Sequence, residues 1–476
     1  MRSLITALSL PALLAAGMLG HVAPTQAQAQ AQPVRVNPLE QSRPLRPGAP
    51  RWLEDYRFLD DPAKRTDWFD DYRYHRLSDS AWLQLGGEFR YRADTMRQPL
   101  FGLTPVHKDN YLQQRIQAHA DLNLLDGGLR GFVQLENTRS WGKELQTPRD
   151  QSRNDIHQAF IESNLGLSDK RLRVRAGRQE MAYGVHALVT YAETPNIRQT
   201  FDGLRVTLSG TGGRTLDAFA VRPVRHEDGN FDDKSDNNTR FYGLYGSLPL
   251  AEGTGIDLYS MGLERKQLRL YGVTGQDTRY TFGTRLFGQR AGYDWSWDLM
   301  HQRGHFAGQS IRAWSIWSES GYTFTHEWKP RLAMRVDLSS GDDDPTDGRA
   351  ETFDPHFPRG GVYGETGLTN PANLLVFGPM LAFSPRHDLR IEPAIFKHWR
   401  QSTDDAIYLP GMRTVPGSAG ADGREIGTNY RLNARWTPTA NLTLDLDYQY
   451  FRAGSAVRDL DGVSTQLLAL RSSFRF

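Results

Sequence analysis

The stretch that decides the fold is residues 112–124, which reads LQQRIQAHADLNL. Apolar and polar residues alternate along it, with Leu112, Ile116, Ala118, Ala120, Leu122 and Leu124 set against Gln113, Arg115, Gln117, His119, Asp121 and Asn123. A period of two places each set on its own face of a β-strand. The stretch therefore predicts a strand with one apolar and one charged face.

The same alternation recurs along the chain, clearly in residues 82–92, 332–338 and 442–450. In a soluble sandwich the polar face of such strands meets water on the outside. In a membrane barrel the apolar face meets lipid and the polar face lines the lumen. Alternation alone leaves both architectures open.

The connections between the strands favour the membrane barrel. Short turns, such as residues 126–128 and 438–441, alternate strictly with longer polar segments, such as residues 265–278, 304–309 and 341–373. Outer-membrane barrels sort their connections in this way, whereas a sandwich has no reason to do so. We therefore predict an all-β fold, a transmembrane antiparallel β-barrel of about 18 strands with short periplasmic turns and long extracellular loops.

Composition points in the same direction. Only 38% of the residues are hydrophobic, whereas glycine (45) and aromatic residues (22 Phe, 19 Tyr, 11 Trp) are abundant. A soluble protein of this length needs more apolar residues for its core, but a barrel with a wet interior needs no such core. With a net charge of +2, nothing suggests a nucleic-acid partner, and the absence of cysteine excludes disulfides and thiolate metal sites.

The N-terminus predicts export. Met1 and Arg2 precede an apolar run over residues 4–19, and Ala27, Ala29 and Ala31 offer small-residue cleavage sites. We expect residues 1–31 to be a cleaved signal peptide, 32–80 a periplasmic N-terminal segment and 81–476 a barrel in the outer membrane of a Gram-negative bacterium.

The C-terminal strand ends on Phe476, which shares one face with Leu470, Ser472 and Phe474. A terminal strand that ends in Phe resembles the signal read by the outer-membrane barrel-assembly machinery. We therefore expect that machinery, together with outer-membrane lipid, among the partners of the chain.

Strand parity assigns a set of charged residues to the lumen. The predicted pore-lining residues are Arg90, Arg115, Arg130, Glu136, Arg175, Arg205, Arg285, Asp298, Arg335, Asp337, Glu392, Arg400, Arg431 and Arg471. Arg92, Arg173, Arg390, Arg435 and Arg475 share that face, and its remaining acids are Glu88, Asp121, Asp257, Asp445 and Asp447. Rings of arginine select anions, and the guanidinium fork suits carboxylates. The alternative is that these arginines pair with the acids and fill the barrel.

Enzymatic and metal motifs are lacking. There is no Gly-x-Ser-x-Gly elbow, Walker loop or His-Glu-x-x-His motif, and the 13 histidines are scattered. The acidic stretch 341–347 lacks the ligand order of an EF-hand and is interpreted as a solvated loop. We expect no cofactor, no metal and no enzymatic activity.

Several motifs resemble those of the alginate export family of outer-membrane barrels. The most specific lie in residues 175–203: RAGRQE (175–180), YG (183–184), PNIR (195–198) and FDG (201–203). Other matching pieces are WLEDYRFL (52–59), LGGEFR (85–90), SGD (340–342), FDPHFP (353–358) and KHWR (397–400). The resemblance implies a monomeric barrel of eighteen strands with a basic constriction that passes an anionic polysaccharide. It places Glu162, Arg178 and Arg400 in that constriction or its supporting network.

Two positions depart from that pattern. The family has an acid where this chain has Asn429, so one lumen charge is missing. Strict alternation of the two strand faces would also point the side chain of Arg178 toward lipid. We expect either that Arg178 lies at the outer end of its strand or that a bulge at Gly177 redirects it.

The resulting hypothesis is a channel for an anionic polysaccharide or a sugar acid, resembling an alginate export porin. The first alternative is an uptake porin for small organic acids or oligosaccharides, which the same arginines would suit. A barrel enzyme or an adhesin is the remaining class. Residues 51–80 and the loop 341–373 are the candidate plugs of the two mouths.

Overall fold

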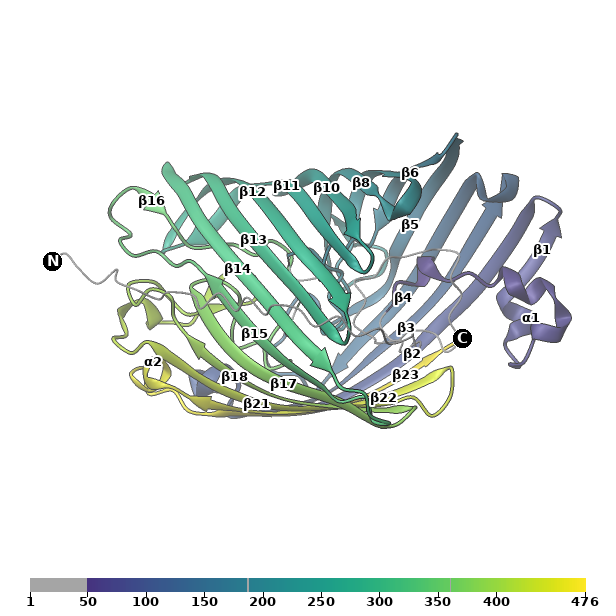
Figure 1. Cartoon of the computed structure of the whole chain (residues 1–476). Coiled ribbons are helices and arrows are strands. Elements are labelled where there is room, and N and C mark those ends of the chain that lie inside the picture. The colour runs from purple at the N-terminus through teal and green to yellow at the C-terminus, as the bar shows by residue number, and fades with distance from the viewer. Residues whose placement is uncertain (1–48, 186–187, 360) are drawn as a thin grey trace, which may run out of the picture. The chain divides into compact units, whose positions relative to one another are not determined.

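The computed structural model describes residues 49–185, 188–359 and 361–476. The predicted signal peptide, residues 1–31, lies outside the described residues. Figure 1 shows long tilted strands that wrap around a common interior. Within the described residues, no helix is both long enough and apolar enough to cross a membrane.

A single sheet of 21 strands contains the barrel. Three short strands, β1, β9 and β16, lie outside the ring, and the other eighteen form it. Their bounds are β2 (Ala81–Arg97), β3 (Lys108–Leu124), β4 (Leu129–Trp141), β5 (Ser152–Leu167), β6 (Lys170–Gln179), β7 (Phe201–Ser209), β8 (Thr215–Arg225), β10 (Thr239–Ala251), β11 (Thr254–Leu270), β12 (Val273–Arg290), β13 (Tyr293–Phe306), β14 (Gln309–Thr323), β15 (Arg331–Ser339), β17 (Leu374–Arg386), β18 (Leu389–Trp399), β21 (Glu425–Trp436), β22 (Leu442–Ala453) and β23 (Thr465–Arg475). Antiparallel pairing of β2 with β23, from Glu88↔Arg475 to Arg97↔Gln466, closes the ring and confirms the predicted fold class.

The remaining elements are short. They comprise β1 (Tyr74–Ser78), β9 (Lys234–Ser235), β16 (Arg349–Ala350), β19 (Tyr408–Leu409), β20 (Arg413–Thr414), α1 (Asp70–Arg73), α2 (Ser455–Arg458), η1 (Arg51–Leu53), η2 (Arg57–Asp60), η3 (Pro62–Lys64), η4 (Pro99–Gly102), η5 (Leu125–Gly127), η6 (Thr211–Gly213) and η7 (Ser418–Gly420). The elements α1 and β1 lie at the same end of the barrel as the C-terminus, whereas α2 and β16 lie at the opposite end (Figure 1). We call these the short-turn end and the long-loop end.

The alternation of short and long connections holds with two corrections. Residues 265–278 and 304–309 were expected to be long loops, but β11–β12 and β13–β14 are joined by two-residue turns at residues 271–272 and 307–308. The expectation was wrong because β11 and β12, with 17 and 18 residues, continue as strands through polar sequence. Polarity in an outer-membrane barrel marks the end of the lipid-facing band rather than the end of the strand.

The two faces of the strands are inverted relative to a soluble protein. Phe89 and Tyr91 are 42% and 45% exposed, whereas Arg90 and Arg92 between them are only 0% and 3% exposed. Apolar side chains therefore point out of the ring and charged ones into it, as in a membrane barrel. This polarity excludes the sandwich alternative.

The interior is partly apolar, which corrects the expectation of an entirely wet lumen. A buried cluster includes Tyr183, Phe219, Phe241, Tyr245 and Tyr259. Tyr183, from a loop, stacks on the inward-facing Tyr245 at 4.6 Å between ring centroids. Loops that enter the barrel supply the partners that inward-facing aromatic residues need.

No bulge occurs at Gly177. It pairs in register with Phe160 on one side and Gly203 on the other. Both glycines have positive φ, 127° and 153°, and a Cβ at either position would collide with a neighbouring carbonyl oxygen. Glycine is needed here because two strands approach closely with a backbone conformation that other residues avoid.

Candidate functional site

Two loops from the long-loop end enter the barrel and meet inside it. They are residues 180–200, between β6 and β7, and residues 340–373, between β15 and β17. The backbone N–H of Thr190 donates to the carbonyl of Phe357 (3.0 Å), and that of Phe357 donates to the carbonyl of Leu188 (3.1 Å). The joined loops therefore cross the lumen. The loop 341–373, which was one of the two candidate plugs, thus enters the barrel.

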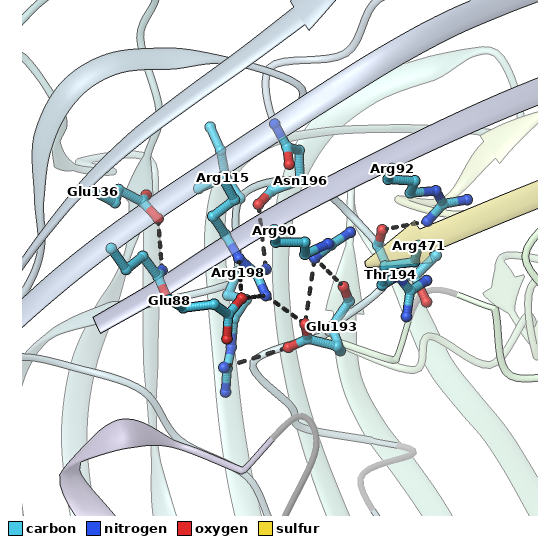
Figure 2. A network of polar contacts seen from close by, with 12 residues as sticks. Glu88, Arg90, Arg92, Arg115, Glu136, Glu193, Thr194, Asn196, Arg198 and Arg471 are labelled. Atoms are coloured by element: carbon cyan, nitrogen blue, oxygen red, sulfur yellow. Dashed lines mark hydrogen bonds and ion pairs between the residues drawn. The ribbon is translucent and has the colours of Figure 1, made fainter. Parts of the chain in front are cut away.

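The first loop carries a carboxylate to the far wall. Figure 2 shows Glu193 among the guanidiniums of Arg90, Arg115 and Arg198. The nitrogen–oxygen distances are 2.5 Å to Arg115, 3.3 Å to Arg90 and 3.3 Å to Arg198. Burial raises the pKa of Glu193, but the attraction of Arg115, Arg198 and Arg90 outweighs it and lowers the pKa to about 2. The group is an anion at every physiological pH.

The backbone of the same loop is fixed by side chains of the barrel wall. Arg90 donates to the carbonyl of Glu193 at 3.1 Å and Arg92 donates to that of Thr194 at 2.9 Å. Asn196 extends the contact in the other direction, because its Nδ2 donates to the carbonyls of Gln114 (2.9 Å) and Asp150 (2.9 Å). The loop therefore has a defined position along β2 and β3.

The second loop carries another carboxylate to the same wall. Glu365 lies 2.8 Å from Arg471 on β23 and 2.9 Å from Arg92 on β2. These two guanidiniums hold the pKa of Glu365 far below its ordinary value, against the opposing effect of burial. We call Arg90, Arg92, Arg115 and Arg471 the arginine row, and each of its members binds Glu193 or Glu365.

At the short-turn end the N-terminal segment enters the mouth. Arg51 donates to the carbonyls of Gly87 (2.9 Å) and Phe476 (3.0 Å), and Arg130 donates to that of Trp52 (2.6 Å). The guanidinium of Arg175 stacks 4.0 Å from the centre of the Trp52 ring. A cavity of about 380 Å³ remains beside the segment. Trp52, Trp82 and several charged residues line this cavity.

Six of the ten arginines predicted to line the pore lie in separate ion pairs. These are Arg130–Asp121 (2.6 Å), Arg175–Glu162 (2.5 Å), Arg205–Asp217 (2.5 Å), Arg285–Asp257 (2.6 Å), Arg335–Glu319 (2.7 Å) and Arg431–Asp447 (2.8 Å). Their inward direction matches strand parity, but the pairing neutralises much of the expected arginine excess.

The predicted acids have varied surroundings. Glu136 lies 3.2 Å from the Nδ1 of His157, and Asp298 accepts a hydrogen bond from the Tyr259 hydroxyl at 2.6 Å. Asp337 accepts from the backbone N–H of Ser318 at 3.1 Å. Glu392 pairs with Arg390 at 2.9 Å and is 43% exposed in its side chain. The structure thus distributes these acids around the wall rather than gathering them.

Arg178 and Arg400 lie outside the arginine row. Arg178, near the long-loop end of β6, binds Asp202 (2.8 Å) and the carbonyl of Asp233 (3.1 Å). Arg400 donates to loop carbonyls, including those of Thr403 (3.0 Å) and Ser418 (2.8 Å), and is fully buried. Their described contacts organise the loops 226–238 and 400–424.

Asn429 takes part in positioning the second loop. Its Nδ2 donates to the carbonyl of Tyr363 (2.9 Å) and to the Oε1 of Gln449 (3.1 Å). An acid at this position would accept rather than donate, so it could not make the bond to Tyr363. The departure from the family pattern therefore has a structural counterpart in the placement of loop 340–373.

Sequence reasoning missed the loop carboxylates Glu193 and Glu365 and the strand acids Asp94, Asp217 and Glu319. The strand acids share inward parity with their partners, so a full parity count would have found them. Glu193 stands two residues before the PNIR motif, which is its only local signal. Glu365 has none, because nothing in its neighbourhood predicts that the loop turns inward.

Among the residues that the structure describes, one cluster of acidic side chains could hold a cation. Asp155, Asp232 and Asp233 bring ligand oxygens within 4.8 Å of one another. Asp155 accepts from the backbone N–H groups of Asp232 (2.9 Å) and Asp233 (3.0 Å). These bonds account for the geometry of the cluster, so it supports no metal assignment.

The low pKa of Glu193 predicts how the lumen responds to acid. A carboxylate whose pKa is lowered from 4.5 to about 2 stabilises the docked loop above pH 4.5, and that stability is lost as the pH falls through about 2. We therefore expect single-channel recordings to show the same conductance levels from pH 7 to pH 4, with a new, larger level only below about pH 3. A larger level that emerges between pH 5 and pH 4 would mean that Glu193 titrates normally and that the arginines do not hold it.

Comparisons with known proteins agree with this architecture. The family model described as "Alginate export" matches residues 81–469. Among solved structures, the chain resembles a BenF-like porin from Pseudomonas fluorescens Pf-5 (TM-score 0.58, 10% identity, 83% of this chain and 98% of that one). It also resembles OccK2 (OpdF) from Pseudomonas aeruginosa (0.55, 12%, 83% and 97%) and OccK11 (OpdR) from the same organism (0.54, 12%, 85% and 99%).

These structural likenesses concern the fold, and a search of curated proteins finds no match. The family match covers nearly the whole barrel, including the motifs of residues 175–203. The family match, together with the porin-like barrel fold, supports a location in the outer membrane of a Gram-negative bacterium. The chain belongs to the alginate export family and is an outer-membrane channel.

Proposed function

We propose that this channel passes an anionic polysaccharide or a sugar acid, and that the carboxylates of this solute bind the arginine row. The observation that carries the proposal is the position of Glu193 and Glu365. Two carboxylates from two different loops rest on the same set of guanidiniums. A uronate chain presents carboxylates at regular intervals, so it could replace them one for one.

The row becomes strongly basic when the loops move away. Arg115 would keep Glu88 (2.7 Å) and Arg92 would keep Asp94 (2.7 Å). For Arg90 and Arg471, the described ion pairs are those with the loop carboxylates alone. Movement of the loops therefore exposes two guanidiniums without acidic partners, and fixed positive charge lowers the cost of anion entry.

Arg359, which strand parity could not assign because it lies in a loop, adds to the positive charge of the lumen. Arg359 lies in the second loop and has no ion pair within the described part of the chain. Loss of solvation, together with the neighbouring Arg335 and Arg431, lowers the pKa of Arg359 to about 10. It stays charged at neutral pH, beside two other guanidiniums.

An uptake porin for small organic acids is the second candidate, favoured by the joined loops that narrow the lumen. Planar bilayers separate the two functions. We expect an anion-selective reversal potential and a current blocked by alginate oligomers at lower concentrations than by acetate or succinate. Cation selectivity would overturn the proposal, and block by the small carboxylates alone would favour the uptake porin.

We further infer that the protein is a monomer without catalytic activity. The closed pairing of β2 with β23 leaves no free edge for a partner strand. The C-terminal Phe476 donates its N–H to the carbonyl of Gly87 (3.1 Å), at the seam that the barrel-assembly machinery must close. Size measurements in detergent test the monomeric state, and assembly of a Phe476→Ala variant in cells tests the role of Phe476 at this seam.

A further inference from the structure

Two arginines face each other on the outer wall of the barrel. Arg303 on β13 and Arg312 on β14 are directly opposite in the antiparallel register. Both are exposed, and both lie on the lipid-facing side, like Leu299 and Ile316 on the same two strands. Side chains opposite each other in a sheet have Cβ atoms about 5 Å apart, and like charges there are destabilising.

Protein groups do not compensate this pair. Among the described residues, none offers a carboxylate oxygen within 4.0 Å of either guanidinium. The neighbours on the same face of β13 are His301 and His305, and the Nε of Arg303 donates to the Nε2 of His301 at 2.9 Å. Arg240 on β10 is also exposed at the long-loop end, but it lies 3.8 Å from Glu264.

The pair lies at the depth of a membrane surface. On β14 the outward residues run from Tyr322, at the short-turn end, through Ser320, Ser318, Ile316 and Trp314 to Arg312. Ten residues at about 3.3 Å each, tilted by about 40°, span roughly 25 Å, the height of the apolar band of such barrels. Trp314 precedes Arg312 on the outer face of β14, and Tyr280 on β12 lies directly opposite Arg303, as aromatic residues do at the membrane interface. Arg303 and Arg312 therefore lie level with the headgroups of the outer leaflet.

We propose that Arg303 and Arg312 bind the phosphate groups of lipopolysaccharide in the outer leaflet. An anion between the two guanidiniums converts mutual repulsion into two charge-assisted contacts, and arginine is well suited to phosphate. This proposed lipid contact depends on the outer-membrane location of the protein, and it is independent of the solute that the channel transports.

The test uses the full-length mature barrel in dodecyl maltoside, titrated with lipopolysaccharide and followed by native mass spectrometry. We expect R303Q/R312Q to bind lipopolysaccharide at least ten-fold more weakly than the wild type. R240Q, at the same end but already beside a carboxylate, is expected to remain within two-fold of it. Removal of the lipid phosphates by phosphatase should weaken binding to the wild type to the level of the double variant.

Two outcomes would overturn the proposal. One is equal binding of lipopolysaccharide by the wild type and the double variant. The other is equal affinity of the wild type for lipopolysaccharide and phosphatidylglycerol, which would make the pair a general anionic-lipid contact. If the double variant fails to fold, the single variants R303Q and R312Q serve instead, because each removes the repulsion and half of the phosphate site.

Discussion

Replacement of Glu193 by glutamine is expected to increase the time that the channel spends in a larger-conductance state by about ten-fold or more. The change removes the charge that meets Arg115, Arg90 and Arg198, and leaves the size of the side chain nearly unchanged. Removal of one partner from a buried ion pair costs about 3–5 kcal/mol, and because Glu193 is 27% exposed we expect roughly half of that. Each 1.4 kcal/mol is worth a factor of about ten in the docked population of the loop.

The matched control is Glu392→Gln. Glu392 is also a predicted lumen carboxylate, but its described ion pair is with Arg390 on its own strand. Within the described residues, it makes no hydrogen bond or ion pair with the first loop, residues 180–200. Single-channel recordings of both variants at pH 7 give the comparison. The same open time for E193Q and E392Q would show that Glu193 does not hold the loop.

The fold was predictable because the lipid and the lumen impose a period of two on every strand. Arg90 and Phe89 are adjacent in sequence and opposite in exposure, so their parity alone orients β2. The two-residue turns after β11 and β13 were missed, since strands that rise beyond the membrane lose the apolar half of the pattern. A mostly polar run, such as residues 264–270, then looks the same whether it forms a strand or a loop.

The site was predictable only where it lies on strands. Parity placed Arg90, Arg115 and Arg471 on the inner wall without any knowledge of their partners. The path of a loop depends instead on contacts far apart in sequence, such as that between Thr190 and Phe357, which leave no periodic signal. The same limitation applies to Arg400: its position next to β18 is predictable, but its bonds to the carbonyls of its own loop are not.

Replacement of Arg115 by glutamine is expected to loosen the first loop as strongly as E193Q, while shifting ion selectivity in the opposite direction. Arg115 is fully buried and binds Glu88 (2.7 Å), Glu193 (2.5 Å) and the carbonyl of Asn196 (3.4 Å). R115Q removes one positive charge from the lumen, whereas E193Q removes one negative charge. A unit charge about 5 Å from the ion path changes its energy by about 0.8 kcal/mol in water, which corresponds to about four-fold in permeability.

Reversal potentials in a salt gradient measure this difference, and the double variant R115Q/E193Q separates charge from loop position. It leaves the net charge of the lumen as in the wild type, so its anion preference should return to the wild-type value while its open time stays long. If R115Q and E193Q instead shift selectivity in the same direction, the charge of the arginine row does not set it. The position of the loop would then be the cause, because it is the one property that both substitutions change alike.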